Sequence, residues 1–554
     1  MEKRQDINKL IEYAVTVWRN EGRDANDANS DFFNLQNDPV TRLLMGAVAY
    51  QTDSISEDIS SFKNDIVEEL VDLCAPEYLL QPVPAVGMLQ TGKTHKVGQT
   101  DEEATRLDEN MVFSISTTPG NKFSFIPILS INMFDLKVHS VAPSGRNRWH
   151  IELEEIEPVI DLFGLAFYLP KVSCERVLLH VGASTIDICN ISDFERLPFI
   201  ASFMDTSRPN KNAMQFATLH NIYDRLCLCS NNYCIVDKHI PSESIPRQNG
   251  CIQFDVEFVG GTDLERIAPE DILLNCVPVC NVEIHKDSLT QERPLQNVSL
   301  RGSEEFLTLS SHTQPEGLVD SVSVRQVGTS RMTPAVWLQR LQRLLDYYDS
   351  EYCLLRNTFD PKFDNILQQF ILALRDAVKR GVDVDDRIYL VLRDRMIPSL
   401  GVTWLSSFGA KANDIAPGAK VEVNTAQLDA EQTGLVSYTM GGCNAVTNSE
   451  TRHEALRYQV QLRDRIVSKS DILFFCRYKL SDLFSVKAEG IKDIRISNRV
   501  QNSPEGFLEK ILMVEILLQP DVTIDGQAAL ALERMVRSRN AGVTPIRIHI
   551  QTEE

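Results

Sequence analysis

The sequence predicts a multidomain α+β fold with long N-terminal helices, β-rich middle domains and a C-terminal α+β part that ends in a ferredoxin-like split unit. Three observations predict this class: a long amphipathic helical period near the N-terminus, β-branched and aromatic runs over residues 81–330, and the order helix–strand–strand–helix–strand near the C-terminus. A length of 554 residues corresponds to about three or four domains. The expected parts are an N-terminal helical region (1–80), one or two β-rich middle domains with helical insertions (81–330), a helical pair plus strands (331–445) and a ferredoxin-like α/β domain (446–554).

Residues 1–80 are predicted to be helical. Asp38 suits the cap and Pro39 the first turn of a helix in which apolar residues recur every three or four positions until Pro76 ends it. An apolar stripe of about 30 residues, roughly 45 Å long, exceeds what a small core covers. The stripe packs either on a partner or within a helical bundle of the same chain. Its candidate interface residues are Leu44, Val48, Ile55, Ile59, Phe62 and Ile66.

Residues 81–330 are predicted to be mainly strands. Short β-branched and aromatic runs stand at residues 86–91, 111–116, 149–154 and 251–258. The dipeptide Asn249-Gly250 predicts a hairpin turn before the last of these strands. A helix is expected near residues 213–225, and the polar segment 302–331 is expected to be a connection.

Residues 331–445 predict two helices followed by strands. Pro334 and Pro361 suit the first turns of the helices, and strands are expected at residues 387–392 and 401–405. Apolar residues recur at helical spacing in both helices, so these faces are further candidates for packing with a partner. The candidate interface residues are Trp337, Leu341, Phe370 and Leu374.

The C-terminal segment predicts a split βαβ unit. Ser468 and Asp471 form a capping-box pattern that starts a helix running to Leu483. Strands at 491–497 and 511–519, a helix at 527–539 and a strand at 545–550 complete a ferredoxin-like unit that lacks its first strand. Such a unit buries one sheet face under two helices and leaves the other face available to another module.

The net charge of −21 excludes two classes of partner. The chain carries 56 Lys and Arg residues against 77 Asp and Glu residues, whereas binding to nucleic acid or to anionic membranes requires an excess of cations. No run approaches the roughly 18–20 apolar residues of a membrane span, and the N-terminus lacks a signal-peptide core. The cysteines are scattered. We therefore expect a reduced, cytoplasmic protein with no direct membrane insertion.

One segment matches a catalytic motif. The residues from Gly87 to Thr94 fit G-x-x-x-x-G-K-T, the phosphate-binding loop, and would make the chain a nucleotide-binding enzyme. That loop requires a strand before it and a helix after it, because backbone N–H groups at the helix N-terminus hold the phosphates. Pro-Val-Pro precedes this segment, and no helical period follows it. The context therefore counts against a nucleotide site.

Metal and catalytic constellations are not expected, and no cofactor is predicted. The cysteines at 227, 229, 234, 276 and 280 lack the paired C-x₂-C spacing of structural zinc sites. Leu226 and Leu228 alternate with sulfurs, which predicts a strand with buried free thiols. The segment from His453 to Arg457 begins like a zinc-protease motif but has Arg in place of the second His. The chain is therefore predicted not to be an enzyme.

Two ends of the chain resemble a known family. The helix opening Asp38-Pro39-Val40-Thr41-Arg42-Leu43-Leu44 and the helix stop Pro76-Glu77-Tyr78-Leu79-Leu80-Gln81-Pro82-Val83-Pro84 resemble the N-terminal region of TssF, the baseplate wedge component of type VI secretion systems. The segment Asn275-Cys276-Val277-Pro278-Val279-Cys280-Asn281 is similar to a mid-chain segment of that family. Cys74-Ala75 and Glu77 depart from its usual residues.

The C-terminal segment resembles a related family. Arg463-Asp464-Arg465-Ile466-Val467 with Asp471 is similar to the motif of phage baseplate J-type wedge proteins. The resemblance implies a non-enzymatic scaffold that assembles with a TssG-like wedge partner, a second copy of itself, a TssK-like adaptor, a VgrG-like hub and TssE with the sheath. The alternative is the same wedge role in a phage tail or another contractile machine. The charge would make two copies repel, so assembly is expected to rely on apolar helix stripes, on local basic patches such as residues 457–465, or on partners of opposite charge.

Overall fold

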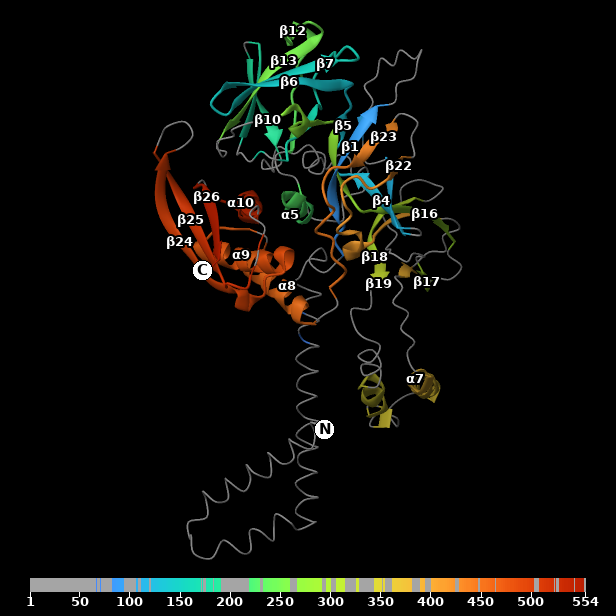
Figure 1. Ribbon diagram of the computed structural model, residues 1–554. Helices are drawn as coiled ribbons and strands as arrows, with labels where there is room; N and C mark the ends of the chain where they lie inside the picture. Colours follow the sequence, from blue (N-terminus) through green and yellow to red (C-terminus); the bar gives the residue numbers. More distant parts are fainter. Residues whose placement is uncertain are drawn as a thin grey trace, which may run out of the picture. The chain divides into compact units, whose positions relative to one another are not determined.

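The structure is a computed structural model that describes part of the chain (Figure 1). The chain divides into two compact units, Met1–Ala75 and Pro76–Glu554. In the first unit only Ile66 and Leu70 are described; both are helical and exposed. The described residues are 66, 70, 82–93, 106–107, 111–118, 121–170, 172, 176–182, 184–190, 219–229, 233–259, 267–290, 295–299, 305–313, 325–327, 343–350, 352–353, 361–380, 389–393, 400–423, 428–446, 449–463, 465–502, 508–522, 524, 528–542 and 544–552.

The second unit is mixed and rich in sheet, and its first large sheet has six strands. The strand order is β22-β3-β4-β15-β1-β23, with every pairing antiparallel. The strands are β1 (Val86–Lys93), β3 (Phe113–Thr118), β4 (Asn121–Pro127), β15 (Cys276–Cys280), β22 (Val421–Val423) and β23 (Leu428–Leu435). Strands from both sides of residue 330 pair here, so the boundary predicted at that residue does not separate two sheets. A boundary drawn from composition cannot detect pairing between distant segments.

The second large sheet follows the alternating pattern of its strands. Its order is β14-β8-β11-β10-β9-β13-β7-β6, and β12 pairs with β13. The strands are β6 (Leu136–Gly145), β7 (Arg148–Glu155), β8 (Ala166–Tyr168), β9 (Arg176–Val181), β10 (Ser184–Asn190), β11 (Tyr233–Ile235), β12 (Arg247–Gln248), β13 (Cys251–Val259) and β14 (Leu273–Leu274). Alternate residues of β7, such as Trp149 and Ile151, are buried in a separate core.

The predicted hairpin turn before β13 is confirmed. Arg247 and Gln248 of β12 pair with Ile252 and Cys251 of β13. The two residues between them, Asn249 and Gly250, both have positive φ values, 53° and 81°. This conformation suits the right-handed twist of the two strands and favours Asn-Gly. A local sequence pattern was therefore sufficient to place this turn.

Smaller sheets again join distant segments. Two three-stranded sheets have the orders β16-β21-β18 and β17-β20-β19, and β2 pairs with β5. The strands are β2 (Arg106–Leu107), β5 (Ile131–Asn132), β16 (Glu283–Leu289), β17 (Leu295–Ser299), β18 (Glu305–Thr313), β19 (Arg325–Val327), β20 (Tyr389–Arg393) and β21 (Leu400–Ser407). Four short 3₁₀ helices in the described residues are η3 (Ser242–Ser244), η4 (Pro269–Asp271), η5 (Gly409–Ala412) and η6 (Ala488–Gly490).

Helix α5 (Leu219–Cys229) corrects one sequence interpretation. Leu226 and Leu228 were expected on a strand, and that expectation is wrong because both lie in this helix. The helix packs against β1 and against α10 (Ala528–Arg539), so residues on several of its sides are buried. Burial on several sides removes the one-sided period that distinguishes a surface helix from a strand in sequence. The described helix overlaps the one expected near residues 213–225.

The C-terminal elements follow the predicted order. They are α8 (Ser449–Leu462), α9 (Lys469–Phe484), β24 (Ile491–Asn502), β25 (Leu508–Leu518), α10 and β26 (Ile546–Thr552). The sheet order is β24-β25-β26, with β24 antiparallel and β26 parallel to β25. The parallel pair β25 and β26 is joined through α10, as in a βαβ crossover. Ser468 and Asp471 form the predicted capping box at the start of α9.

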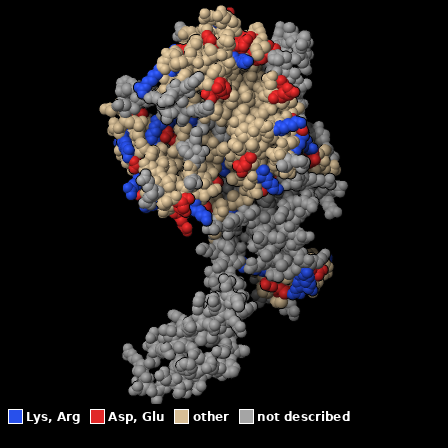
Figure 2. Space-filling model, in the orientation of Figure 1, with Lys and Arg blue, Asp and Glu red and all other residues tan. Residues whose placement is uncertain are grey.

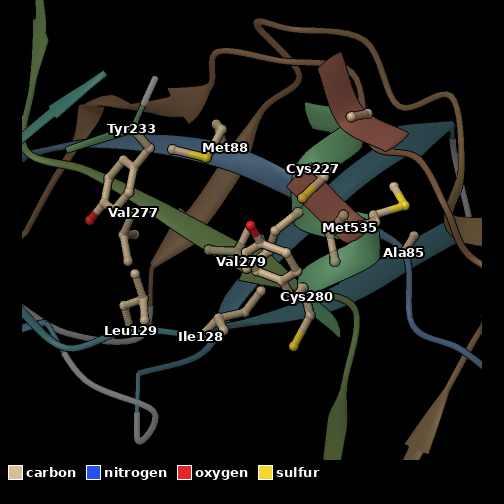
Figure 3. Packing of buried hydrophobic residues seen from close by; sticks show 14 of the residues in the cluster. Ala85, Met88, Ile128, Leu129, Cys227, Tyr233, Val277, Val279, Cys280 and Met535 are labelled. Carbon is tan, nitrogen blue, oxygen red and sulfur yellow. The ribbon is translucent and has the colours of Figure 1, made fainter. Parts of the chain in front are cut away.

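The core of the first sheet is continuous with that of the C-terminal elements. Buried residues from β1, β4, β15, α5 and α10 belong to one apolar cluster. Figure 3 shows Met88, Cys227, Val279 and Met535 gathered in this cluster. Burying such side chains contributes roughly 1.5–3 kcal/mol each relative to exposure. Apolar contact therefore holds α5 and α10 close together, and the polar groups between them become buried as well.

Candidate functional site

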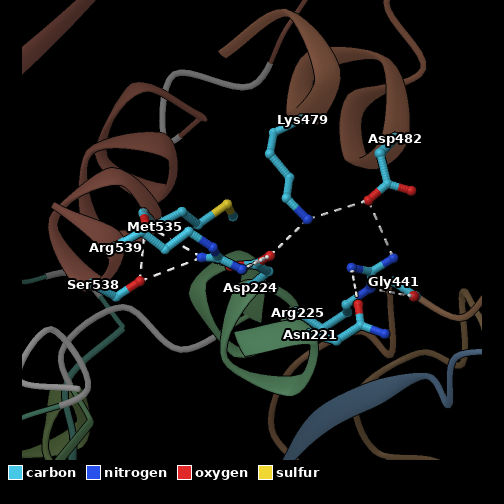
Figure 4. A network of polar contacts seen from close by, with 9 residues as sticks. All are labelled: Asn221, Asp224, Arg225, Gly441, Lys479, Asp482, Met535, Ser538 and Arg539. Atoms are coloured by element: carbon cyan, nitrogen blue, oxygen red, sulfur yellow. Dashed lines mark hydrogen bonds and ion pairs between the residues drawn. The ribbon is translucent and has the colours of Figure 1, made fainter. Parts of the chain in front are cut away.

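A network of buried charges connects α5 with α9 and α10 (Figure 4). Asp224 of α5 contacts Arg539, which lies 315 residues later in the chain. Arg225 of α5 contacts Asp482, which lies 257 residues later. In the described residues the network has two carboxylates and three cations. No local sequence pattern marks this network, because its members are single charged residues far apart in the chain.

Asp224 is the centre of the network. Its Oδ1 and Oδ2 accept hydrogen bonds from Nη1 and Nη2 of Arg539 at 2.8 and 2.9 Å. Lys479 Nζ lies 2.7 Å from Oδ2. Burial raises the pKa of Asp224, but the charges of Arg539 and Lys479 outweigh burial and lower the pKa below its ordinary value. Asp224 is therefore a fully buried carboxylate that stays ionised because two cations pair with it.

Asp482 joins Arg225 to the same network. Its Oδ2 lies 3.5 Å from Arg225 Nη2 and 3.6 Å from Lys479 Nζ. Arg225 Nε also donates to the carbonyl oxygen of Gly441 at 3.3 Å. Burial lowers the pKa of Arg225, whereas Asp482 raises it, and the net effect is a raised pKa. One guanidinium thus connects α5, α9 and the loop that contains Gly441.

The network can position helices rather than move protons. Both oxygens of Asp224 are engaged by cations, and Asp482 contacts Arg225 and shares Lys479 with Asp224. Arg539 also lies over the ring of Phe475, 5.1 Å from its centroid. A buried pair of this kind specifies how elements meet more than it adds net stability. The geometry therefore fixes α9 and α10 relative to α5.

The segment that matches the phosphate-binding motif is a strand. Gly87 to Lys93 lie in β1, which pairs with β15 on one side and β23 on the other. A phosphate-binding loop needs several consecutive N–H groups that converge on one anion. In a strand, consecutive N–H groups instead point in alternate directions toward the two neighbouring strands. Lys93 pairs with Leu428 within the sheet. Thr94 lies outside the described residues.

The cysteines considered for zinc lie in apolar surroundings. Cys227, Cys234, Cys276 and Cys280 are buried free thiols. Burial raises the pKa of Cys227 and of Cys280 to about 12, which keeps both thiols protonated at neutral pH. Across the described ranges, no group of three or more His, Cys, Asp or Glu side chains has a geometry that could hold a metal ion. The side chain of Cys229 is not described.

The structure describes only part of the predicted partner interface. Ile66 is helical and exposed, and Phe370 and Leu374 lie in α7 (Pro361–Arg380), the helix expected to begin at Pro361. The side chain of Leu374 is not described. The remaining candidates lie outside the described residues; they are Leu44, Val48, Ile55, Ile59, Phe62, Trp337 and Leu341.

Three large apolar side chains of α7 are exposed among its described residues: Ile366 and Phe370, one turn apart, and Leu372. Ile366 is 65% exposed and Phe370 is 44% exposed, while Ile371 is buried. Residues 343–350 are helical as well, and the two segments meet through an edge-to-face contact of Tyr348 with Phe370 and an ion pair of Arg375 with Asp349. Residues 343–350 therefore cover only part of the apolar surface of α7.

No helix within the described ranges combines the length and apolar character needed to cross a membrane. No protein-family model matches the chain. No curated protein matches it either.

Solved structures similar to this chain are chains of baseplate complexes. They include a chain of the type VI secretion system TssK-TssF-TssG baseplate subcomplex, with 14% identity and a TM-score of 0.46, over 93% of this chain and 96% of that chain. A chain of the type VI secretion system baseplate complex has 15% identity and a TM-score of 0.35, over 100% and 96%. A chain of the anti-feeding prophage baseplate has 8% identity and a TM-score of 0.21, over 99% and 70%.

Proposed function

We propose that this chain is a structural, non-enzymatic subunit of the baseplate of a contractile injection machine, with the wedge role of TssF. The motif residues at both ends support this role, from Asp38 to Pro84 and from Arg463 to Asp471. In this role the chain acts in the cytoplasm and assembles with TssG-like and TssK-like partners. Contacts with a second copy, a VgrG-like hub and the sheath belong to the same proposal.

The uncovered face of α7 is the observation that carries the proposal. Ile366 and Phe370 lie one helical turn apart and are both exposed. A solvent-facing pair of large apolar side chains on a helix is typical of a surface that packs against another helix. We propose that a helix of the TssG-like partner covers it, and that the N-terminal stripe from Leu44 to Ile66 packs in the same way.

The test is co-purification of the full chain with its TssG-like partner. The variant carries Ile366→Asp and Phe370→Asp, which place two carboxylates on the proposed interface and should abolish co-purification. The matched control carries Gln368→Asp and Leu372→Asp, which have the same spacing and charge. At about 3.6 residues per turn they lie on roughly the opposite side of α7. Leu372 is also exposed, so the control removes an equally accessible apolar side chain.

A second variant tests the N-terminal stripe. Val48→Asp with Ile55→Asp should weaken binding of the same partner if the stripe packs against it. Circular dichroism of each variant must match the unmodified chain, so that a loss of binding is not a loss of folding. Unchanged binding by both variants, with intact folds, would remove both helices from the interface and contradict the proposal.

A further inference from the structure

The turn between α8 and α9 presents a basic and apolar surface. We call it the basic turn; its exposed residues are Arg457, Val460, Arg463, Arg465, Val467 and Lys469. Val467 is 77% exposed and Val460 is 62% exposed. These are high values for valine, which is usually buried. Residues 457–469 thus carry four cations against one carboxylate, Asp464, which lies outside the described residues, and two accessible valines stand among them in the sequence.

Backbone hydrogen bonds hold the basic turn in one conformation. Ile466 forms a bridge with Asn540: its N–H donates to Arg539 O, and its carbonyl oxygen accepts from Ala541 N, both at 3.0 Å. The Arg465 N–H donates to Leu462 O at 3.0 Å. The turn is thus attached to the end of α10 and does not need to order itself when a partner binds. A surface that is already ordered loses less conformational entropy on binding.

Asp471, the carboxylate in the first turn of α9, is already engaged by backbone N–H groups. Asp471 Oδ2 accepts hydrogen bonds from the backbone N–H groups of Val467 and Ser468 at 3.0 and 2.8 Å. Burial raises the pKa of Asp471, but these hydrogen bonds outweigh it and lower the pKa. Both contacts of Asp471 are therefore with the backbone of the turn and its own helix start, while Arg463 and Arg465 are exposed residues.

A locally positive surface is unusual on a chain with a net charge of −21. Charges beyond roughly 8 Å are largely screened at physiological ionic strength, so a short ligand senses mainly the basic turn. A long polyanion would extend past the turn and meet carboxylates. Figure 2 shows Asp and Glu side chains dispersed among Lys and Arg on the face in view. Charge complementarity therefore favours a short acidic segment over a nucleic acid.

We propose that the basic turn binds a short acidic segment of a partner polypeptide that also carries apolar side chains. Carboxylates of the segment pair with Arg463 and Arg465, and its apolar residues contact Val467 and Val460. Guanidinium groups suit carboxylates because they donate two parallel hydrogen bonds. This inference concerns a different surface from α7, and its test does not use the TssG-like partner, so its failure and the failure of the proposed function are distinguishable.

The test measures fluorescence anisotropy of labelled peptides with the full chain. The probe is an amphipathic peptide built from Glu, Leu and Ala, and its comparison peptide has Gln in place of every Glu. The acidic peptide should bind saturably, and its affinity should fall as salt is raised. Arg463→Glu with Arg465→Glu should raise Kd by about tenfold or more, since charge pairs at an interface contribute at this scale.

Matched variants distinguish binding at the basic turn from a general effect of the chain's net charge. Lys137→Glu with Lys238→Glu reverses two exposed cations elsewhere and should leave Kd within about twofold of the unmodified chain. Val467→Ser keeps the charge and should weaken binding through lost apolar contact. Three results would each overturn the proposal: no binding of the acidic peptide, equal effects of the two double variants, or tighter binding of a single-stranded oligodeoxynucleotide of the same net charge.

Discussion

Arg539 donates two parallel hydrogen bonds to Asp224, a residue 315 positions earlier in the chain. Both side chains are buried, with 2% and 0% of their surface exposed. The pair connects the last helix of the chain with a helix from its middle. Because breaking a buried pair leaves an uncompensated charge, this relationship predicts how the fold responds to mutation and to acid.

Arg539→Ala is expected to lower the free energy of unfolding by about 3–5 kcal/mol, because Asp224 would stay buried with only Lys479 beside it. The matched control is Arg537→Ala on the same helix. Arg537 is 39% exposed and pairs with the buried Glu533 at 3.3 Å. Glu533 keeps hydrogen bonds from Arg547 and from the backbone N–H of Ile548, so the loss of Arg537 should cost less than about 1 kcal/mol. Chemical denaturation followed by fluorescence measures both. Equal costs for the two variants would contradict the proposed role of the network.

Acid is expected to weaken the same contact. The pKa of Asp224 is lowered in the folded chain, so below the unfolded value of about 3.9 the unfolded state binds the proton first. The free energy of unfolding should therefore fall as the pH decreases from about 4 through the folded-state pKa. Asp224→Asn should remove this part of the pH dependence, and denaturation midpoints measured from pH 6 to pH 2 check it.

Glu305 is a control for the acid experiment, because its effect on the pH dependence of stability has the opposite sign to that of Asp224. Burial raises the pKa of Glu305, so the folded state keeps its proton to higher pH than the unfolded state does. This group alone makes stability fall as pH rises above about 4.3, the ordinary value for Glu. Glu305→Gln should remove that decrease. A change of the same sign in both variants would show that the slopes do not report these two groups.

Gly441→Ala is expected to destabilise the chain more than Gly418→Ala. Both glycines have positive φ values, 78° and 81°, so both substitutions carry strain of about 1–2 kcal/mol. A Cβ at Gly441 would lie 2.6 Å from the Arg225 side chain, whereas nothing lies within 4 Å of a Cβ at Gly418. The difference in unfolding free energy therefore reports the packing of Arg225. Equal losses would mean that Arg225 moves aside without cost.

Lys93→Ala should not change nucleotide binding, because Lys93 lies in a strand that is paired within a sheet. The melting temperature of the full chain should be the same with and without Mg-ATP, for the variant as for the unmodified chain. Saturable binding of ATP that disappears in Lys93→Ala would restore the phosphate-loop interpretation.

Features that depend on neighbouring residues could be predicted from the sequence. The Asn249-Gly250 turn is an example, since the conformation of two residues fixes the hairpin. The capping box of Ser468 and Asp471 is another, because both reciprocal contacts lie within four residues. At Leu226 and Leu228 the sequence pattern predicts a strand, although both lie in helix α5, because this helix is buried on several sides. Periodicity distinguishes helix from strand only where one side faces water.

The sequence by itself determined the alternation of strands in the middle of the chain, the order of the C-terminal elements and the absence of a phosphate-loop context at Gly87. Only the tertiary structure decided that strands from both sides of residue 330 share sheets and that Asp224 meets Arg539. The physical reason is the distance along the chain over which each interaction acts. Propensity, capping and turn geometry act over a few residues, whereas sheet pairing and buried ion pairs depend on which distant segments the apolar core brings together.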